Sequence, residues 1–70
     1  MIINAGQYYN FVFYSGKNLT GKALNSVTSK NQNIKVEWVE PIGKSQIVHN
    51  STFPASSVMQ VFSNGLKLNN

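Results

Sequence analysis

The sequence predicts a single all-β domain of five short strands that curl into a small closed barrel. Its apolar residues recur at every second position far more often than at helical spacing, which is the pattern of half-buried strands. The apolar segments are short and are separated by runs rich in Gly, Pro, Asn and Ser. With 70 residues the chain suffices for one domain with one thin core.

The first strand is predicted over residues 7–14, a run of mostly aromatic and β-branched residues without glycine or proline. Alternation places three aromatic residues on one face: Tyr9, Phe11 and Phe13. It places three further apolar residues on the other face: Tyr8, Val12 and Tyr14. Because both faces are largely apolar, we expect this strand to be covered on both sides or to offer one face to a partner.

A turn over residues 15–18, with Gly16 free to take a positive φ, leads into the second strand. That strand is predicted over residues 19–28. Gly21 lies near its start, where a glycine usually marks a bulge or a tight bend. A polar loop over residues 29–33 then connects it to the third strand.

The third strand, over residues 34–39, shows the clearest alternation in the chain. Its apolar face comprises Ile34, Val36 and Trp38. A turn over residues 40–44 follows, where Pro41 is expected to end the hydrogen-bonded ladder because it has no amide hydrogen. The fourth strand covers residues 45–53, with Ile47 and Phe53 facing inward.

The last part of the chain is predicted to form one turn of 3₁₀-helix over residues 54–57 and a short fifth strand over residues 58–62. The domain therefore spans residues 1–70, with its core within residues 7–63. Residues 64–70 are expected to form a flexible polar tail, from which Leu66 and Leu68 can dock on the barrel.

This order of elements resembles the small SH3-like barrels, and the resemblance covers residues 16–62. The spacing Gly16-x-x-x-x-Gly21-x-Ala23, followed by Val27 and Ile34-x-Val36-x-Trp38, is similar to the glycine-punctuated opening of KOW and Tudor-type barrels. The segment from Phe53 to Val58 resembles the 3₁₀ turn that leads into their final strand. The resemblance implies a closed barrel that binds nucleic acids or proteins.

The composition argues against catalysis. The absence of cysteine excludes disulfides, thiolate metal sites and thiol nucleophiles. His49 is the only histidine, and Glu37 and Glu40 are expected on opposite faces of a strand, so no metal site or acid–base pair is predicted. We therefore expect no enzymatic activity, no cofactor and no metal. Without a basic leader or a long apolar run, the chain is expected to be cytoplasmic and to have no contact with a membrane.

The net charge of +4 comes from six lysines against two glutamates, and it points to a polyanionic partner. The chain has no arginine to read guanine with a bidentate fork, so any binding of DNA or RNA is expected to be sequence-tolerant and salt-sensitive. The candidate site is a basic rim of lysines with two tyrosines as stacking faces: Lys17, Lys22, Lys30, Lys35, Lys44, Tyr8 and Tyr14. The bias toward lysine and asparagine suits an AT-rich genome such as that of a phage.

Two other interpretations stay open. The aromatic first strand can make the chain an inhibitor or adaptor that docks on a larger host enzyme. The same surface can also build a homo-oligomer. Against each functional interpretation stands an ordinary structural one, in which the lysines solvate loops and Trp38, on one face with Ile34 and Val36, belongs to the core.

Overall fold

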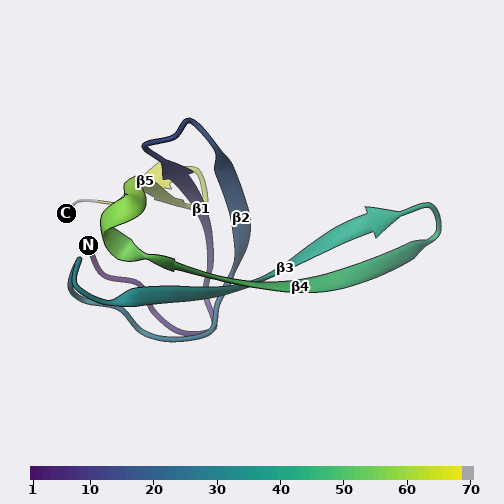
Figure 1. Cartoon of the computed structure of the whole chain (residues 1–70), viewed down its shortest axis with the longest axis horizontal. Helices are drawn as coiled ribbons and strands as arrows, with labels where there is room; N and C mark the ends of the chain where they lie inside the picture. Colours follow the sequence, from purple (N-terminus) through teal and green to yellow (C-terminus); the bar gives the residue numbers. More distant parts are fainter. Residues whose placement is uncertain (69–70) are drawn as a thin grey trace.

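The computed structural model describes residues 1–68 and has an all-β architecture, as predicted. These residues form the following elements: β1 (Tyr8–Phe13), β2 (Asn18–Ala23), β3 (Asn33–Ile42), β4 (Ser45–Pro54), the 3₁₀ turn η1 (Ala55–Ser57), β5 (Val58–Ser63) and β6 (Leu66–Lys67). The strands make one antiparallel sheet in the order β4-β3-β2-β1-β5-β6 (Figure 1). The 3₁₀ turn before the fifth strand is confirmed.

The sheet is open, so the predicted closed barrel of five strands is wrong in both closure and strand number. Within residues 1–68 the two outer strands, β4 and β6, do not pair with each other. β2 meets β3 only at Lys22↔Glu37 and Ala23↔Val36, after which β3 leaves it. β3 and β4 are ten residues long and contain no glycine at which to turn a corner, so they continue as a ribbon.

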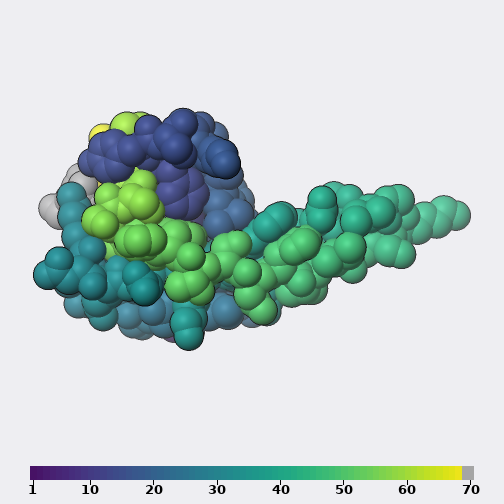
Figure 2. Space-filling model, viewed as in Figure 1, coloured from purple at the N-terminus to yellow at the C-terminus, as the bar shows by residue number. Residues whose placement is uncertain are grey.

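This ribbon divides the molecule into two regions. We call residues 39–48 the arm; it projects from a rounded remainder, the body, and lengthens the molecule to 38 Å against 22 and 21 Å in the other directions (Figures 1 and 2). Every residue of the arm is exposed. The buried core lies wholly in the body: Ile3, Tyr9, Phe11, Ala23, Val27, Ile34, Val36, Ala55, Val58 and Val61. Ile47, which was predicted to face inward, is 44% exposed because no second layer covers the arm.

Gly21 allows the close crossing of β2 and β3 from which the arm departs. A β-carbon at Gly21 would stand 2.5 Å from Val36 Cγ1 and 2.6 Å from the Glu37 carbonyl oxygen. The predicted tight bend at this glycine is therefore a close backbone approach, which only a residue without a side chain permits.

β2 is shorter than predicted and ends at Ala23. Beyond it, the side chain of Asn25, in place of the backbone of a longer β2, makes hydrogen bonds to β3. The Asn25 side chain donates to the Asn33 carbonyl at 2.9 Å and accepts from the Lys35 amide at 2.9 Å. The chain beyond it turns away, and Val27 pairs with Ile3 in an isolated bridge of two backbone hydrogen bonds, 2.8 and 2.9 Å long. The core therefore begins at Ile3, before the predicted limit of residue 7.

Pro41 does not end the ladder as predicted, because pairing continues to Ile42↔Ser45. The two-residue turn Gly43–Lys44 closes the hairpin, with Gly43 at a φ of 58° as a type II′ turn requires. Closing pairs of such turns are hydrogen-bonded, and the pairs then alternate, so Pro41↔Gln46 is a non-hydrogen-bonded pair. The nitrogen of Pro41 therefore points away from β4, where no donor is needed.

The chain that was predicted to be a flexible tail extends the sheet instead. Asn64 and Gly65 have φ values of 53° and 78°, the two positive values of a type I′ hairpin turn. β6 follows, and the Leu68 amide donates to the Val61 carbonyl at 2.8 Å. Residues 69 and 70, the end of the predicted tail, lie outside the described residues.

Candidate functional site

Strand register gathers aromatic and basic side chains on the outer face of the body, which we define as the sheet face opposite the core. In β1, Tyr9 and Phe11 are buried, so Tyr8 and Asn10 point outward. Tyr8 lies directly opposite Lys22 of β2, and Phe62 of β5 lies opposite Lys67 of β6. Asn10 stands between them, paired with Thr20 on one side and with Phe62 on the other.

A depression of about 520 Å³ opens among these side chains, and we call it the outer hollow. Its lining includes Tyr8, Asn10, Thr20, Phe62 and Asn64. Tyr8 is 65% exposed, whereas Phe62 is half-buried. The Asn10 side-chain amide donates to the Thr20 hydroxyl at 2.6 Å, which fixes both polar groups in the hollow. The site therefore offers two ring faces with a hydrogen-bonding pair between them.

Lysines stand on both sides of the outer hollow. Lys22 and Lys67 lie on strands three steps apart in the sheet, which places the two strands about 14 Å apart. The Lys22 ammonium is 3.8 Å from the Glu37 carboxylate, and both side chains are more than a third exposed, so this ion pair contributes little to stability. Lys35 faces the same side two residues before Glu37. Three lysines thus outnumber the single acid on this face.

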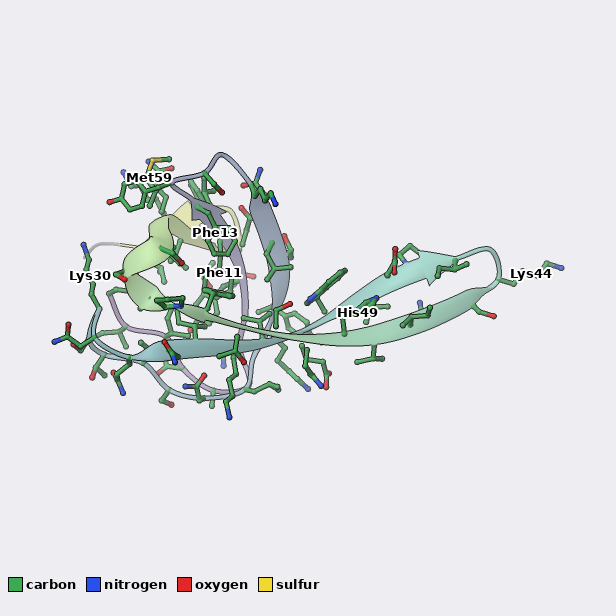
Figure 3. All side chains as sticks on the ribbon, in the orientation of Figure 1. Phe11, Phe13, Lys30, Lys44, His49 and Met59 are labelled. Atoms are coloured by element: carbon green, nitrogen blue, oxygen red, sulfur yellow. The ribbon has the colours of Figure 1, made fainter. Side chains whose placement is uncertain are left out.

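The structure brings together only part of the predicted site. Tyr8, Lys22 and Lys35 share the outer face. The loop lysines do not form a common rim: Lys30 and Lys44 lie at opposite ends of the long axis (Figure 3), and Lys17 lies in the β1–β2 turn. Tyr14 is 66% exposed but lies apart from the hollow, beside η1, where its amide donates to the Ser57 carbonyl.

Sequence reasoning missed two residues at this site: Phe62, which lines the outer hollow, and Lys67, which lies opposite Phe62 in the sheet. The signal for both was present. An Asn-Gly dipeptide between apolar segments is the strongest short-range sign of a hairpin, and Asn64-Gly65 follows Phe62 and precedes Leu66. Such a hairpin would have placed Lys67 opposite Phe62.

A second concavity, of about 800 Å³, lies beside the core at the base of the arm, and we call it the aromatic groove. It is lined chiefly by Phe13, Leu19, Trp38 and Phe53, with Lys17 at its border. The rings of Phe13 and Phe53 meet edge to face, with centroids 4.8 Å apart. Trp38 therefore belongs partly to the core and partly to this groove.

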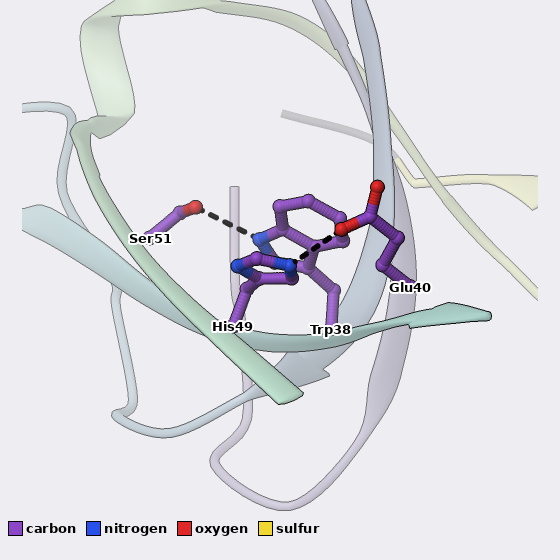
Figure 4. Close-up of polar contacts among 4 residues, drawn as sticks. All are labelled: Trp38, Glu40, His49 and Ser51. Atoms are coloured by element: carbon purple, nitrogen blue, oxygen red, sulfur yellow. Dashed lines mark hydrogen bonds and ion pairs between the residues drawn. The ribbon is translucent and has the colours of Figure 1, made fainter. Parts of the chain in front are cut away.

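Polar contacts hold Trp38 at the base of the arm (Figure 4). Its indole N–H donates to the Ser51 hydroxyl at 2.9 Å, and its ring stacks on His49 with centroids 4.3 Å apart and planes 19° apart. His49 Nε2 lies 2.9 Å from the Glu40 carboxylate. Glu37 pairs with Lys22 on the outer face, so the two glutamates lie on opposite faces, as predicted. Among residues 1–68, no cluster of three His, Cys, Asp or Glu side chains could hold a metal ion.

Comparisons with protein-family models, with curated proteins and with solved structures found no match. In the part of the chain that the structure describes, no helix is long and apolar enough to cross a membrane.

Proposed function

We propose that this protein binds single-stranded nucleic acid with low sequence specificity through the outer hollow. The observation that carries the proposal is the register that sets Tyr8 opposite Lys22 and Phe62 opposite Lys67, on either side of one depression. Bases stack on aromatic faces while lysines contact the phosphates, which is how sequence-tolerant single-strand binders work.

The chemistry of the site also explains the expected lack of specificity. Lysine gives a point charge without the fixed fork of arginine, and the chain has no arginine. The lining of the hollow has few polar side chains that could contact base edges, and one N–H of Asn10 is already donated to the Thr20 hydroxyl. Affinity therefore depends on stacking and phosphate contact, and the latter weakens as salt concentration rises.

The matched tyrosines give the first test. Tyr8→Ala and Tyr14→Ala remove rings that are 65% and 66% exposed, but only Tyr8 lines the hollow. Titration of a dye-labelled oligothymidylate, followed by fluorescence anisotropy at low salt, should show a loss of about 1–3 kcal/mol for Tyr8→Ala and none for Tyr14→Ala. If wild-type protein fails to bind DNA or RNA at low salt, the proposal is wrong.

Lysine variants give the second test, because a single positive charge can be removed either near the outer hollow or far from it. Lys22→Gln and Lys67→Gln should each lower the slope of log affinity against log salt by about 0.7, the value for one phosphate contact on a single strand. Lys30→Gln and Lys44→Gln, which lie at the two ends of the molecule, should leave that slope unchanged. Equal effects of all four would indicate a diffuse charge attraction without a site.

The aromatic groove supports a second candidate function, recognition of a protein partner. Docking through the first strand is then limited to its exposed face, because β2 and β5 occupy both edges of β1. Phe13, Trp38 and Phe53 can instead receive an apolar side chain, with Lys17 beside an acidic residue of the ligand. Trp38 is the only tryptophan, so its fluorescence reports on the groove. An array of apolar, acidic peptides that leaves this fluorescence unchanged would dismiss the candidate.

A further inference from the structure

β4 leaves one edge of the sheet open. It is the outermost strand, and within residues 1–68 no strand pairs with its other side. Hydrogen-bonded and non-hydrogen-bonded pairs alternate along β3 and β4, starting from the hydrogen-bonded pair Ile42↔Ser45. Every second residue of β4 therefore makes no backbone hydrogen bond to β3: Gln46, Val48, Asn50 and Thr52. Their backbone N–H and C=O groups therefore point outward in a row, ready to pair with another strand.

The other exposed edges are protected, whereas that of β4 is not. Along the arm, the free edge of β3 has Pro41, whose nitrogen offers no donor where a neighbouring strand would require one. β6 has only two residues, and one of them is Lys67. Residues 45–53 of β4 contain no lysine, no acid and no proline. Such a long uncharged edge invites strand pairing.

We propose that β4 pairs antiparallel with β4 of a second copy of this chain, about a two-fold axis at Val48. In this register Val48 faces Val48 of the second copy, and Gln46 faces Asn50 of the second copy. The pairing is closed: it uses the open β4 edge of each copy, and the short β6 strands, each with its lysine, become the two outermost strands of the joined sheet. A foreign strand would not give this mutual protection, which is why the second copy is the occupant.

Apolar exposure along the arm supports this register. Val39 and Val48 are cross-strand partners on the outer face and are 48% and 58% exposed. The two-fold axis at Val48 brings the valine pairs of both copies together in one cluster of four. On the opposite face, Ile47, which is 44% exposed, meets His49 of the second copy. Residues 45–53 contribute no lysine to the paired edges, so two lysines do not lie directly opposite each other within this segment.

Matched proline variants test which edge pairs. Val48→Pro removes an outward N–H from the β4 edge and no hydrogen bond to β3, whereas Val39→Pro does the same on the opposite edge of the same hairpin. Sedimentation equilibrium at micromolar concentrations should give twice the 7.8 kDa chain mass for wild type and Val39→Pro, and the single mass for Val48→Pro. Monomeric wild-type protein, or dimeric Val48→Pro, would overturn the proposal.

Cysteine cross-linking tests the register in a chain that has no cysteine of its own. At the two-fold axis, two Val48→Cys residues would form a hydrogen-bonded pair with Cα atoms about 5.5 Å apart, within reach of a disulfide or a short bismaleimide. Two Thr52→Cys residues would lie about 27 Å apart and should not cross-link. Cross-linking of Thr52→Cys in preference to Val48→Cys would overturn the register. If Val48→Pro loses its β-sheet circular dichroism, Val48→Lys replaces it, because two lysines directly opposite would repel.

Discussion

The body and the arm share the same two strands, yet they differ completely in burial. In the body half of β3, Ile34 and Val36 are fully buried. In the arm half, Ile42 lies on the same face of β3 but is 49% exposed. The difference is the second layer, because β1 and β5 cover β3 only in the body. Alternation decides which way a side chain points, whereas the opposite layer decides whether it is buried.

Two regions built this differently should also differ in stability. A two-stranded ribbon is marginal by itself, so the arm depends on the body and on the contacts of Trp38 at its base. The body holds the whole buried core and should carry the free energy of unfolding.

The strongest contrast is between one large apolar side chain in each region. Phe11→Ala empties a fully buried site in the body and should lower the free energy of unfolding by about 3–5 kcal/mol, which is enough to unfold many domains of this size. Ile47→Ala, in the arm, should change it by less than about 0.5 kcal/mol. Urea unfolding at low protein concentration measures both. Comparable losses for the two variants would mean that the arm is part of the folding unit.

The crossing from which the arm leaves the body should be the next most sensitive point. Gly21→Ala forces a methyl group against Val36 and the Glu37 carbonyl, at a cost of about 1–3 kcal/mol of overpacking. Gly16→Ala is the control: it carries the penalty of a positive φ, but no atom lies within 4 Å of the new methyl group. Thermal unfolding should rank Gly21→Ala as the more damaging change, and the reverse order would show that the crossing is loose.

The β5–β6 turn positions β6 at the edge of the body, and β6 carries Lys67 of the proposed binding site. Gly65→Ala places a β-carbon at a φ of 78° and should cost about 1–2 kcal/mol locally. The expected result is faster amide exchange at Leu68 and weaker binding of oligothymidylate through the loss of Lys67 from its place opposite Phe62. Unchanged binding despite faster exchange would remove Lys67 from the site.

The smallest effect is expected at the base of the arm. His49→Ala removes the stack on Trp38, a cross-strand pair worth about 0.2–1 kcal/mol. Amides of the arm should exchange faster with solvent water, whereas those of Phe11 and Val61 should keep their rates. Gln46→Ala, in the same strand, serves as the control. If core amides also accelerate, the two regions unfold together.

Local pattern in the sequence was enough to predict much of the body. The aromatic run gave β1, the clean alternation from Ile34 gave β3, and the segment after Phe53 gave the 3₁₀ turn. Apolar residues on both faces of β1 predicted either a second covering layer or one exposed face, and Tyr8 is 65% exposed. Each of these features is decided by residues within a few positions of one another.

The features that the sequence did not predict depend on contacts between distant parts of the chain and on strand register. Pairing past Pro41 could not be predicted, because the sequence does not say whether the proline nitrogen points toward β4 or away from it. Closure of the sheet depends on how two distant edges meet, which alternation does not specify. The two lysines beside the outer hollow, Lys22 and Lys67, come from strands that are far apart in the sequence. Among these unpredicted features, the Asn64–Gly65 hairpin is the one that local sequence chemistry could have predicted.

The most direct test of nucleic-acid binding at the outer hollow is an NMR titration of ¹⁵N-labelled protein with unlabelled oligothymidylate, in which the chemical shift of each amide is followed. The outer hollow should respond, with the largest amide shifts near Tyr8, Thr20 and Phe62, while the arm stays unchanged. Shifts confined to the arm or to the aromatic groove around Trp38, or no shifts at low salt, would contradict it.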